Sequence, residues 1–232
     1  MQREKITINS FVHVYNRGNR KQEIVRSNKD KQHFLEILYF LNDEFISANP
    51  IRLLATVVNE PLKRPEIWPE RKPLVKILNF SLSNNHYHLF LKEIRENGIS
   101  LFMKRFGTSM AKYFNAIHKE EGRLFQGPYR MKRVEEEIYF KYLSVYIQVK
   151  NIFEMYPGGY EKAISEFDKA YDWAIKYPYG SLADYVGERN SLIIDKDILG
   201  ELFSSPKEYK EFARQCLEQI NLDDKLGKLT LD

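Results

Sequence analysis

Two apolar stretches near the middle of the chain, residues 74–83 and 86–94, restrict the possible folds most strongly. Each stretch has the length and the composition of a β-strand. Asn84 and Asn85 lie between them, and asparagine tolerates the positive φ angles that a tight turn requires. The sequence therefore predicts an antiparallel hairpin, around which the rest of the fold has to be arranged.

Further strands and helices are predicted on both sides of this hairpin. Residues 10–17 alternate as a strand does, and residues 130–134 are compatible with another short strand. Apolar residues at helical spacing predict three helices, at residues 29–47, 99–119 and 136–151. The segment 50–73 is ambiguous, since IRLLATVV is compatible with a short strand and its proline-rich remainder with a surface loop.

The order of these elements is strand, helix, strand, strand, helix, strand, helix. One antiparallel sheet with helices on one face would make an α+β layer of the ferredoxin-like or RRM-like type. The triplet Pro157-Gly158-Gly159 interrupts the pattern. We therefore expect residues 1–156 to form the α+β unit and residues 157–232 to add a small C-terminal helical extension.

The composition narrows the class of protein. With 232 residues, of which 43% are hydrophobic, the chain suits one globular unit with a small appendage. No apolar run approaches the roughly 20 residues that cross a bilayer, and the polar segment MQREKITINS lacks the apolar centre of a signal peptide. Cys216 is the only cysteine, which excludes an internal disulfide and a cysteine metal cluster. These features predict an intracellular, cytoplasmic protein.

The charge of the chain gives a weak indication of its partner. The net charge of +4 is only mildly basic, but positive side chains are concentrated between residues 101 and 133. Such clustering is compatible with a nucleic-acid partner. The 15 tyrosines and 15 phenylalanines are compatible with stacking on bases and, for most of them, with filling the core.

His86 and His88 are two residues apart in a predicted strand. Alternate residues of a strand point to the same face, so the two imidazoles project together while Tyr87 points the other way. Two adjacent imidazoles can supply half of a divalent metal site, but two histidines on a strand face are often just part of a polar surface. The spacing alone leaves both interpretations open.

The predicted helix at residues 136–151 offers a reactive group. One face of this helix carries Tyr139, Tyr142, Tyr146 and Lys150. A tyrosine hydroxyl close to a divalent cation can attack a phosphate and form a covalent phosphotyrosine. The alternative is that these large residues simply face the core.

Several segments, in order along the chain, resemble the single-tyrosine transposases of the HUH type, in particular the REP-associated tyrosine transposases. NNHYHLFL resembles their HUH motif, and FVHVYNRGNRKQ resembles their first strand and loop. GISLFMKRFGTSMAKYFNAIHKEEGRLFQGPYR resembles their central helix and the loop after it, and YLSVYIQVKN the helix that usually reads Y-I-x-x-N-P. The tail from YPYGSLADYVG is also similar, so the resemblance covers about residues 10–215.

The resemblance implies an activity and a set of site residues. His86 and His88 match the two HUH histidines, which implies that they bind Mg²⁺ or Mn²⁺, and Tyr146 matches the nucleophile. The implied reaction cuts single-stranded DNA, keeps one end as a 5′-phosphotyrosine and releases a 3′-hydroxyl that can later rejoin the strand. The implied partner is single-stranded or hairpin DNA, bound by a monomer or a homodimer.

The chain departs from the family pattern at one important place. Where the family usually has Asn-Pro, this sequence reads Lys150-Asn151, and an ammonium group is a poor ligand beside a metal. Three outcomes are open: Gln148 or Asn151 replaces the missing ligand, Lys150 contacts the scissile phosphate, or the metal site is incomplete. We favour a contact between Lys150 and the phosphate.

Basic and polar residues around these motifs are the predicted DNA contacts, since phosphate contacts give affinity and a strong salt dependence. They are Arg17, Arg20, Lys21, Lys112, Arg123, Gln126, Arg130, Lys132 and Arg133. Each is also compatible with an ordinary solvated side chain. Phe125 and Tyr129 are expected either to stack on bases or to pin their loop to the core.

Three functions remain open at this point. The first is a metal-dependent transposase or single-strand endonuclease, favoured by the presence of His86, His88 and Tyr146 together. The second is a catalytically weak or inactive protein of the same fold that binds hairpin DNA, which the change at Lys150-Asn151 keeps open. The third is a phosphodiesterase in which water attacks, and it predicts cleavage without a covalent adduct.

Overall fold

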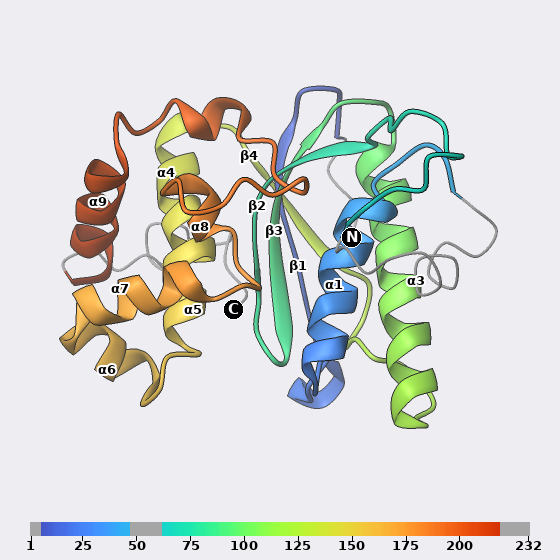
Figure 1. The fold of residues 1–232 in the computed structure, drawn as a ribbon, viewed down its shortest axis with the longest axis horizontal. Coiled ribbons are helices and arrows are strands. Elements are labelled where there is room, and N and C mark those ends of the chain that lie inside the picture. The colour runs from blue at the N-terminus through green and yellow to red at the C-terminus, as the bar shows by residue number, and fades with distance from the viewer. Residues whose placement is uncertain (1–5, 47–61, 219–232) are drawn as a thin grey trace.

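The computed structural model describes residues 6–46 and 62–218. Its four strands are β1 (Phe11–Arg17), β2 (Val75–Leu82), β3 (His86–Glu93) and β4 (Arg130–Val134). They form one sheet in the order β2-β3-β1-β4, and every pair is antiparallel (Figure 1). The predicted α+β class with an antiparallel sheet is confirmed. The short strand considered at residues 51–58 lies outside the described residues.

Strands β2 and β3 form the predicted hairpin. Leu82 pairs with Tyr87 at its end, and the Ser83 N–H donates a 2.9 Å hydrogen bond to the His86 carbonyl. Asn84 and Asn85 occupy the turn between them. The hairpin fixes the direction in which every side chain of β3 points, including those of the two histidines.

Helices α1 (Asn28–Phe40) and α3 (Gly98–His118) lie side by side against one face of the sheet (Figure 1). The Glu93 carboxylate accepts hydrogen bonds from the Gly98 and Ile99 N–H groups and so satisfies the first turn of α3. A Cβ atom on Gly98 would lie 2.2 Å from the Leu74 carbonyl oxygen, so this close approach requires glycine. The helices bury apolar side chains of the sheet such as Val14 and Leu89.

The other face of the sheet is covered as well. Helix α4 (Glu137–Val145) continues through a π-helical turn, η2 (Tyr146–Lys150), into α5 (Asn151–Phe153). Phe90 of β3 contacts Phe140 of α4, with ring centroids 5.5 Å apart. The prediction had helices on one face, whereas the structure has them on both. The reason is that Phe90 and its apolar neighbours on this face also have to be removed from water.

The C-terminal part of the described chain is helical, as predicted. It contains α6 (Gly159–Ser165), α7 (Phe167–Lys176), α8 (Leu182–Tyr185), the 3₁₀ turn η3 (Asp197–Gly200) and α9 (Pro206–Glu218). These helices share one apolar core with α4 and η2. The division of the chain at residues 156 and 157 stays a prediction. None of the described helices is long and apolar enough to cross a membrane.

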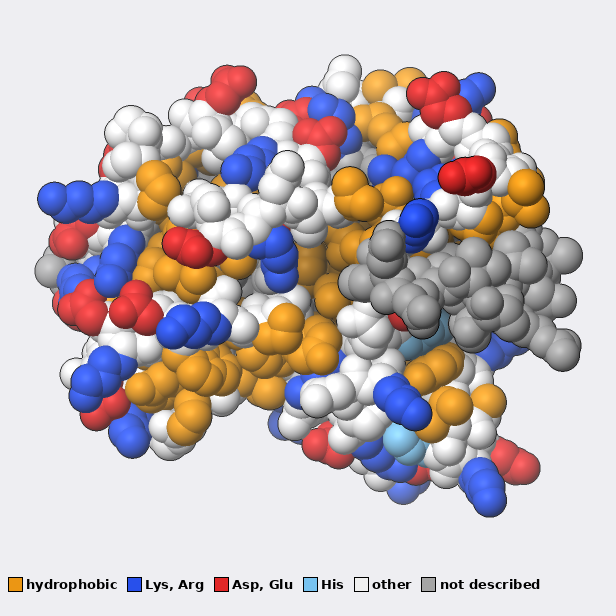
Figure 2. Space-filling view, in the orientation of Figure 1, with side chains coloured by type: hydrophobic (Ala, Val, Ile, Leu, Met, Phe, Trp, Pro, Cys, Tyr) orange, Lys and Arg blue, Asp and Glu red, His pale blue; other side chains and the backbone are white. Residues whose placement is uncertain are grey.

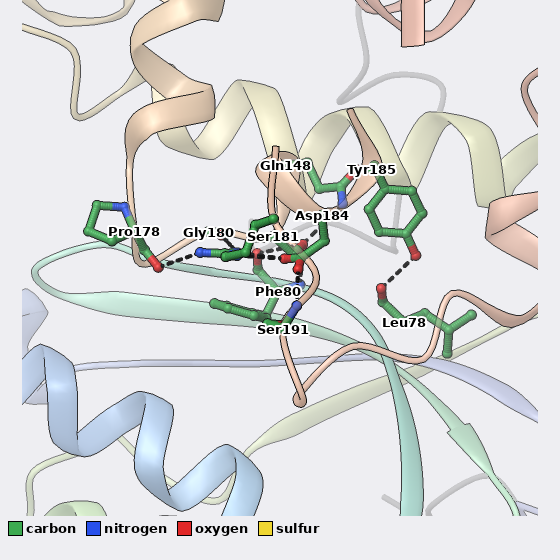
Figure 3. Close-up of polar contacts among 10 residues, drawn as sticks. Leu78, Phe80, Gln148, Pro178, Gly180, Ser181, Asp184, Tyr185 and Ser191 are labelled. Carbon is green, nitrogen blue, oxygen red and sulfur yellow. Dashed lines mark hydrogen bonds and ion pairs between the residues drawn. The ribbon is translucent and has the colours of Figure 1, made fainter. Parts of the chain in front are cut away.

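The segment between α7 and η3 runs along β2, which is an edge strand of the sheet. The Leu82 N–H donates to the Tyr179 carbonyl, the Ser181 N–H to the Phe80 carbonyl, and the Asp195 N–H to the Ile77 carbonyl. The carboxylate of Asp184 holds this segment together, because it accepts hydrogen bonds from the Ser191 N–H and from the guanidinium of Arg189 (Figure 3). The C-terminal segment therefore protects a strand edge that would otherwise be free to pair with another chain.

Candidate functional site

The pairing of β1 with β3 brings the predicted histidines together with residues of the first strand. Tyr15 lies directly opposite His88, and Arg17 directly opposite His86. Opposite residues of an antiparallel pair share a face, so all four side chains belong to the face that α4 and η2 cover. The two histidine rings have centroids 5.2 Å apart and are nearly perpendicular, and only 6% of His86 and 0% of His88 is exposed. They project together, as the sequence predicts.

The protonation of His86 follows from its hydrogen bonds. Its Nδ1 lies 2.7 Å from Ser83 Oγ and 2.7 Å from the carbonyl oxygen of the Asn85 side chain. The Asn85 oxygen can only accept, so Nδ1 carries the proton and Nε2 keeps its lone pair. Burial, together with the charges of Arg17 and Lys150, lowers the pKa of His86 to about 4. The ring is therefore neutral at neutral pH, as a metal ligand has to be.

His88 is held by a third histidine that the sequence analysis did not single out. His13 of β1 places Nε2 2.8 Å from Nδ1 of His88. The other nitrogen of His88, Nε2, is buried and has no hydrogen-bond partner among the described residues. Burial, followed by the neighbouring His13 and His86, lowers the pKa of His88 well below its ordinary value. A neutral ring with a buried and unpartnered nitrogen is suited to bind a cation.

The π-helical turn brings one of the three candidate tyrosines to the histidines. The ring of Tyr146 meets that of His88 edge-on with centroids 5.4 Å apart, and that of His13 at 6.1 Å. The Asn151 N–H donates to the Tyr146 carbonyl, five residues back, which is the hydrogen bond of a π-helix. Tyr142, in contrast, stacks on Phe212 of α9. Tyr139 packs against the apolar core of this second face.

Lys150 lies beside Tyr146 and adds a positive charge to the site. Its Nζ is 5.0 Å from the centroid of the Tyr146 ring, 5.9 Å from that of Tyr160 and 3.9 Å from the carboxylate of Glu154. Burial is the main cause of the lowered pKa values of His86 and His88, and the charges of Lys150 and Arg17 lower them further. Two cationic side chains therefore adjoin the histidine pair.

The two alternative ligands have different surroundings. The Gln148 side-chain oxygen accepts hydrogen bonds from Tyr209 and Ser144. Its nitrogen donates to Ser181 Oγ (Figure 3). Gln148 thus connects η2 to α9 and to the edge of β2, which leaves neither end of its amide for a metal. Asn151 is buried, and its side-chain nitrogen has no hydrogen-bond partner among the described residues. Of the two, Asn151 remains as a possible extra ligand.

The donor set fits a divalent cation, but sparsely. His86 and His88 can each present an Nε2 lone pair, but imidazole suits metals such as Zn²⁺ and Fe²⁺ better than Mg²⁺ or Mn²⁺, which prefer oxygen ligands. Within the described residues no third histidine, cysteine, aspartate or glutamate completes a metal-binding group with them. Water and substrate oxygens would have to supply the remaining positions. The nearby charges of Arg17 and Lys150 weaken the binding of a cation.

Strand alternation places the predicted DNA contacts of β4 on two opposite faces of the sheet. Arg130 pairs with Tyr15 and Lys132 with His13, which places both on the face of the histidines. Arg133 pairs with Val12 on the opposite face, and its guanidinium lies 3.2 Å from the Glu135 carboxylate. The structure therefore brings Arg130 and Lys132 toward the site and directs Arg133 away from it.

The remaining predicted contacts lie on three separate segments. Arg20 and Lys21 are exposed in the 3₁₀ turn η1 (Asn19–Lys21) that follows β1. Arg123 and Gln126 are exposed in the loop before β4, and Lys112 is exposed on α3, which covers the face away from the histidines. Phe125 contacts Tyr87 at 5.8 Å, and Tyr129 also packs against the core, so both rings pin their loop in place.

One known protein family agrees with the sequence motifs. The family described as "Transposase IS200 like" matches residues 69–150, a range that begins before β2 and includes His86, His88, Tyr146 and Lys150. A solved structure of a REP-associated tyrosine transposase bound to a REP hairpin resembles this chain with a TM-score of 0.44 and 12% sequence identity, over 88% of this chain and 94% of that one. No curated protein matches the chain.

Proposed function

We propose that this chain, whose residues 69–150 match the IS200-like transposase family, is an enzyme that cleaves and rejoins single-stranded DNA through Tyr146. The observation that carries the proposal is the edge-on contact between the Tyr146 ring and the ring of His88, at 5.4 Å. It joins a nucleophile from a helix to a pair of neutral imidazoles from a strand. Such a combination suits phosphoryl transfer to a tyrosine.

The proposed reaction is a reversible exchange of phosphate esters. The Tyr146 oxygen bonds to the phosphorus of the scissile phosphate while the bond from phosphorus to the 3′-oxygen breaks. The phenol proton is lost and the departing 3′-oxygen gains one, so the products are a 5′-phosphotyrosine and a 3′-hydroxyl. One ester replaces another, and a 3′-hydroxyl can therefore reverse the step without an external source of energy.

The proposed cofactor is Mg²⁺ or Mn²⁺, held by Nε2 of His86 and Nε2 of His88. When bound, it would neutralise negative charge on the phosphate oxygens. Arg17 and Lys150 act on the same charge: each can donate to a non-bridging phosphate oxygen. The ammonium group of Lys150 therefore supplies part of the positive charge that would otherwise come from the metal ion alone.

The proposed partner is single-stranded or hairpin DNA. Arg17, Arg130 and Lys132 lie on the face of the histidines and can follow the backbone on either side of the scissile phosphate. Arg20, Lys21, Arg123 and Gln126 extend this surface through the loops next to β1. Over α6, α7 and α9, in contrast, positive and negative side chains are interleaved (Figure 2), as in the ion pair between Lys210 and Asp168.

A second candidate function rests on the same cationic surroundings. Lys150 and Arg17 favour a phosphate over a metal, and no third acidic or histidine ligand joins His86 and His88 in the described part of the chain. A protein with this site could bind hairpin DNA while cleaving it poorly or not at all. The two functions differ in whether a covalent adduct forms.

The test is an assay for a covalent adduct between protein and DNA. Labelled single-stranded hairpins from the sequences beside the gene are incubated with the protein and with Mn²⁺ or EDTA. We expect an adduct that resists denaturation, requires Mn²⁺ and is lost in Tyr146→Phe. Tyr142→Phe is the matched control, since that ring stacks on Phe212 of α9 and should leave the adduct intact.

The other outcomes of this assay separate the alternatives. Cleavage without an adduct would indicate attack by water. Salt-sensitive binding without cleavage, across several hairpins, would support the protein that only binds. An adduct that survives Tyr146→Phe would contradict the assignment of the nucleophile.

A further inference from the structure

We propose that His13 is a positioning residue that keeps the proton of His88 on Nδ1 and thereby leaves Nε2 of His88 as the lone pair that binds the cation. The inference rests on the proposed function, because it takes His88 to be a ligand. It goes beyond that function by assigning a role to a histidine of a different strand. No metal-binding contact is assigned to His13 itself.

The contact between the two histidines is short and shielded from water. His13 Nε2 and His88 Nδ1 are 2.8 Å apart, a distance at which one nitrogen donates a proton and the other accepts it. Both side chains are 0% exposed, so water does not compete for either atom. The rings lie nearly parallel, at 20°, with centroids 5.0 Å apart.

The sheet builds this contact from its register. Phe90 pairs with His13, and His88 pairs with Tyr15, so the two histidines are diagonal neighbours on one face of the sheet. Tyr15 stacks against His88 at 5.7 Å and 22°, and Tyr146 meets the ring edge-on. Packing on these sides restrains the ring, and the hydrogen bond to His13 is what distinguishes one ring nitrogen from the other.

Two arrangements of the proton are possible, and they have opposite consequences. If His13 donated, the proton of His88 would sit on Nε2, which has no hydrogen-bond partner among the described residues. A buried and unsatisfied N–H destabilises the folded state, and no cation can bind to it. If His88 donates, Nε2 carries a lone pair, which a bound cation satisfies. A hydrogen bond that fixes the tautomer of a ligand histidine is a common requirement of metal sites.

The experiment compares the wild type with two variants of His13 in the absence of DNA. His13→Phe keeps a ring of similar shape and removes the acceptor, whereas His13→Gln keeps an acceptor oxygen. Nitrogen NMR of ¹⁵N-histidine-labelled protein reports which nitrogen of His88 carries the proton, with His88→Gln identifying the signal. Titration with Mn²⁺ alone gives the affinity of the site.

We expect the Nδ1–H tautomer of His88 in the wild type and in His13→Gln, and a shift of the proton toward Nε2 in His13→Phe. The affinity for Mn²⁺ should fall about 10- to 100-fold in His13→Phe and change much less in His13→Gln. A purely structural role of His13 would lower stability without moving the His88 proton. Unfolding curves of both variants provide this control.

The proposal is overturned if wild-type His88 carries its proton on Nε2, a result that needs no variant to fold. It is also overturned if folded His13→Phe keeps both the tautomer and the affinity for Mn²⁺. A third outcome is that the His88 proton moves from Nδ1 in the wild type to Nε2 in His13→Phe, while the wild type binds no Mn²⁺. This outcome would support the action of His13 on His88. The same result would count against the metal-dependent function, so the two failures are distinguishable.

Discussion

Lys150 stands four residues after Tyr146, with its Nζ 5.0 Å from the Tyr146 ring and 3.9 Å from the Glu154 carboxylate. The resemblance to HUH transposases gives this position to a polar metal ligand, which an ammonium cannot be. In the structure, burial lowers the pKa of His86 and of His88, and the charge of Lys150 adds to both shifts. The same charge opposes a metal ion and attracts a phosphate.

Replacing Lys150 by glutamine should therefore separate the two effects. We expect Lys150→Gln to bind Mn²⁺ about tenfold more tightly, equivalent to about 1.4 kcal/mol, because a positive charge is removed from the vicinity of the site. Binding of single-stranded DNA should weaken at the same time. Calorimetric titration with Mn²⁺ and DNA measures both, and Lys162→Gln on the exposed side of α6 is the control. Unchanged affinities for both ligands would remove Lys150 from the site.

At the scale of elements, the site depends on strand alternation and on one irregular helical turn. Alternation along β1 and β3 places His13, His86 and His88 on one face. The π-helical turn then sets Tyr146 against them. Gln148, in the same turn, is anchored to Tyr209 and Ser181 of the C-terminal part. The C-terminal helices therefore take part in holding the turn that carries Tyr146 in place.

The alternation of β4 makes a prediction about DNA binding. Arg130→Ala and Lys132→Ala should each weaken the binding of single-stranded DNA several-fold and lower the slope of affinity against salt by about one. Arg133→Ala, on the opposite face and paired with Glu135, should leave both quantities nearly unchanged. Binding measured by fluorescence anisotropy at several salt concentrations tests this. Equal losses in all three variants would contradict a DNA path along the histidine face.

The turn η3 is attached to the sheet by charge, which makes a prediction about pH. Burial raises the pKa of Asp197, but hydrogen bonds from Lys76 of β2 and Lys92 of β3 outweigh it and lower the pKa to about 2. An aspartate with a lowered pKa stabilises the fold above its unfolded pKa, near 4, and this stability is lost as the pH falls toward 2. Asp197→Asn should therefore lose about 1–2 kcal/mol of unfolding free energy at pH 7 and much less at pH 2.

Urea unfolding at several pH values measures this difference. Asp195 is the matched control, because it also contacts Lys76 but its side chain is 46% exposed, against 11% for Asp197. Asp195→Asn should change the unfolding free energy less. A loss in Asp197→Asn that is equal at pH 7 and pH 2 would argue against the ion pairs as its cause.

At the scale of the whole molecule, the second face of the sheet and the C-terminal helices form one core. Phe90 of β3, Phe140 of α4 and Phe167 of α7 belong to the same apolar cluster. The edge of β2 is covered by the segment that contains Ser181 and Asp195. The interaction between the two predicted units is thus both apolar and hydrogen-bonded.

A fragment of residues 1–156 should consequently fold poorly. Without the C-terminal helices, α4 and η2 lose the apolar partners on their outer side, and β2 presents an open edge. We expect the fragment to bind a hydrophobic dye and to aggregate, where the full chain stays monodisperse in light scattering. A fragment that unfolds cooperatively, with a stability close to that of the full chain, would contradict this and support an independent first unit.

The local patterns of the sequence determined the strands of the sheet and the face on which the two histidines lie. The Asn84-Asn85 hairpin and the alternation of residues 86–94 placed His86 and His88 on one face, because a period of two leaves no other choice. The resemblance of the motifs then selected Tyr146, rather than Tyr139 or Tyr142, as the predicted nucleophile. The expected family is supported by the match over residues 69–150.

Only the tertiary structure decided which residues meet across strands and helices. The contact of His13 with His88 depends on the register between β1 and β3, which neither strand encodes alone. Gln148 is a candidate ligand by sequence, but its amide binds Ser181 and Tyr209 of the C-terminal part, which packs on the second face of the sheet. A short segment can specify its own period and direction, but its partners are set by burial of the whole chain, which involves residues far apart in sequence.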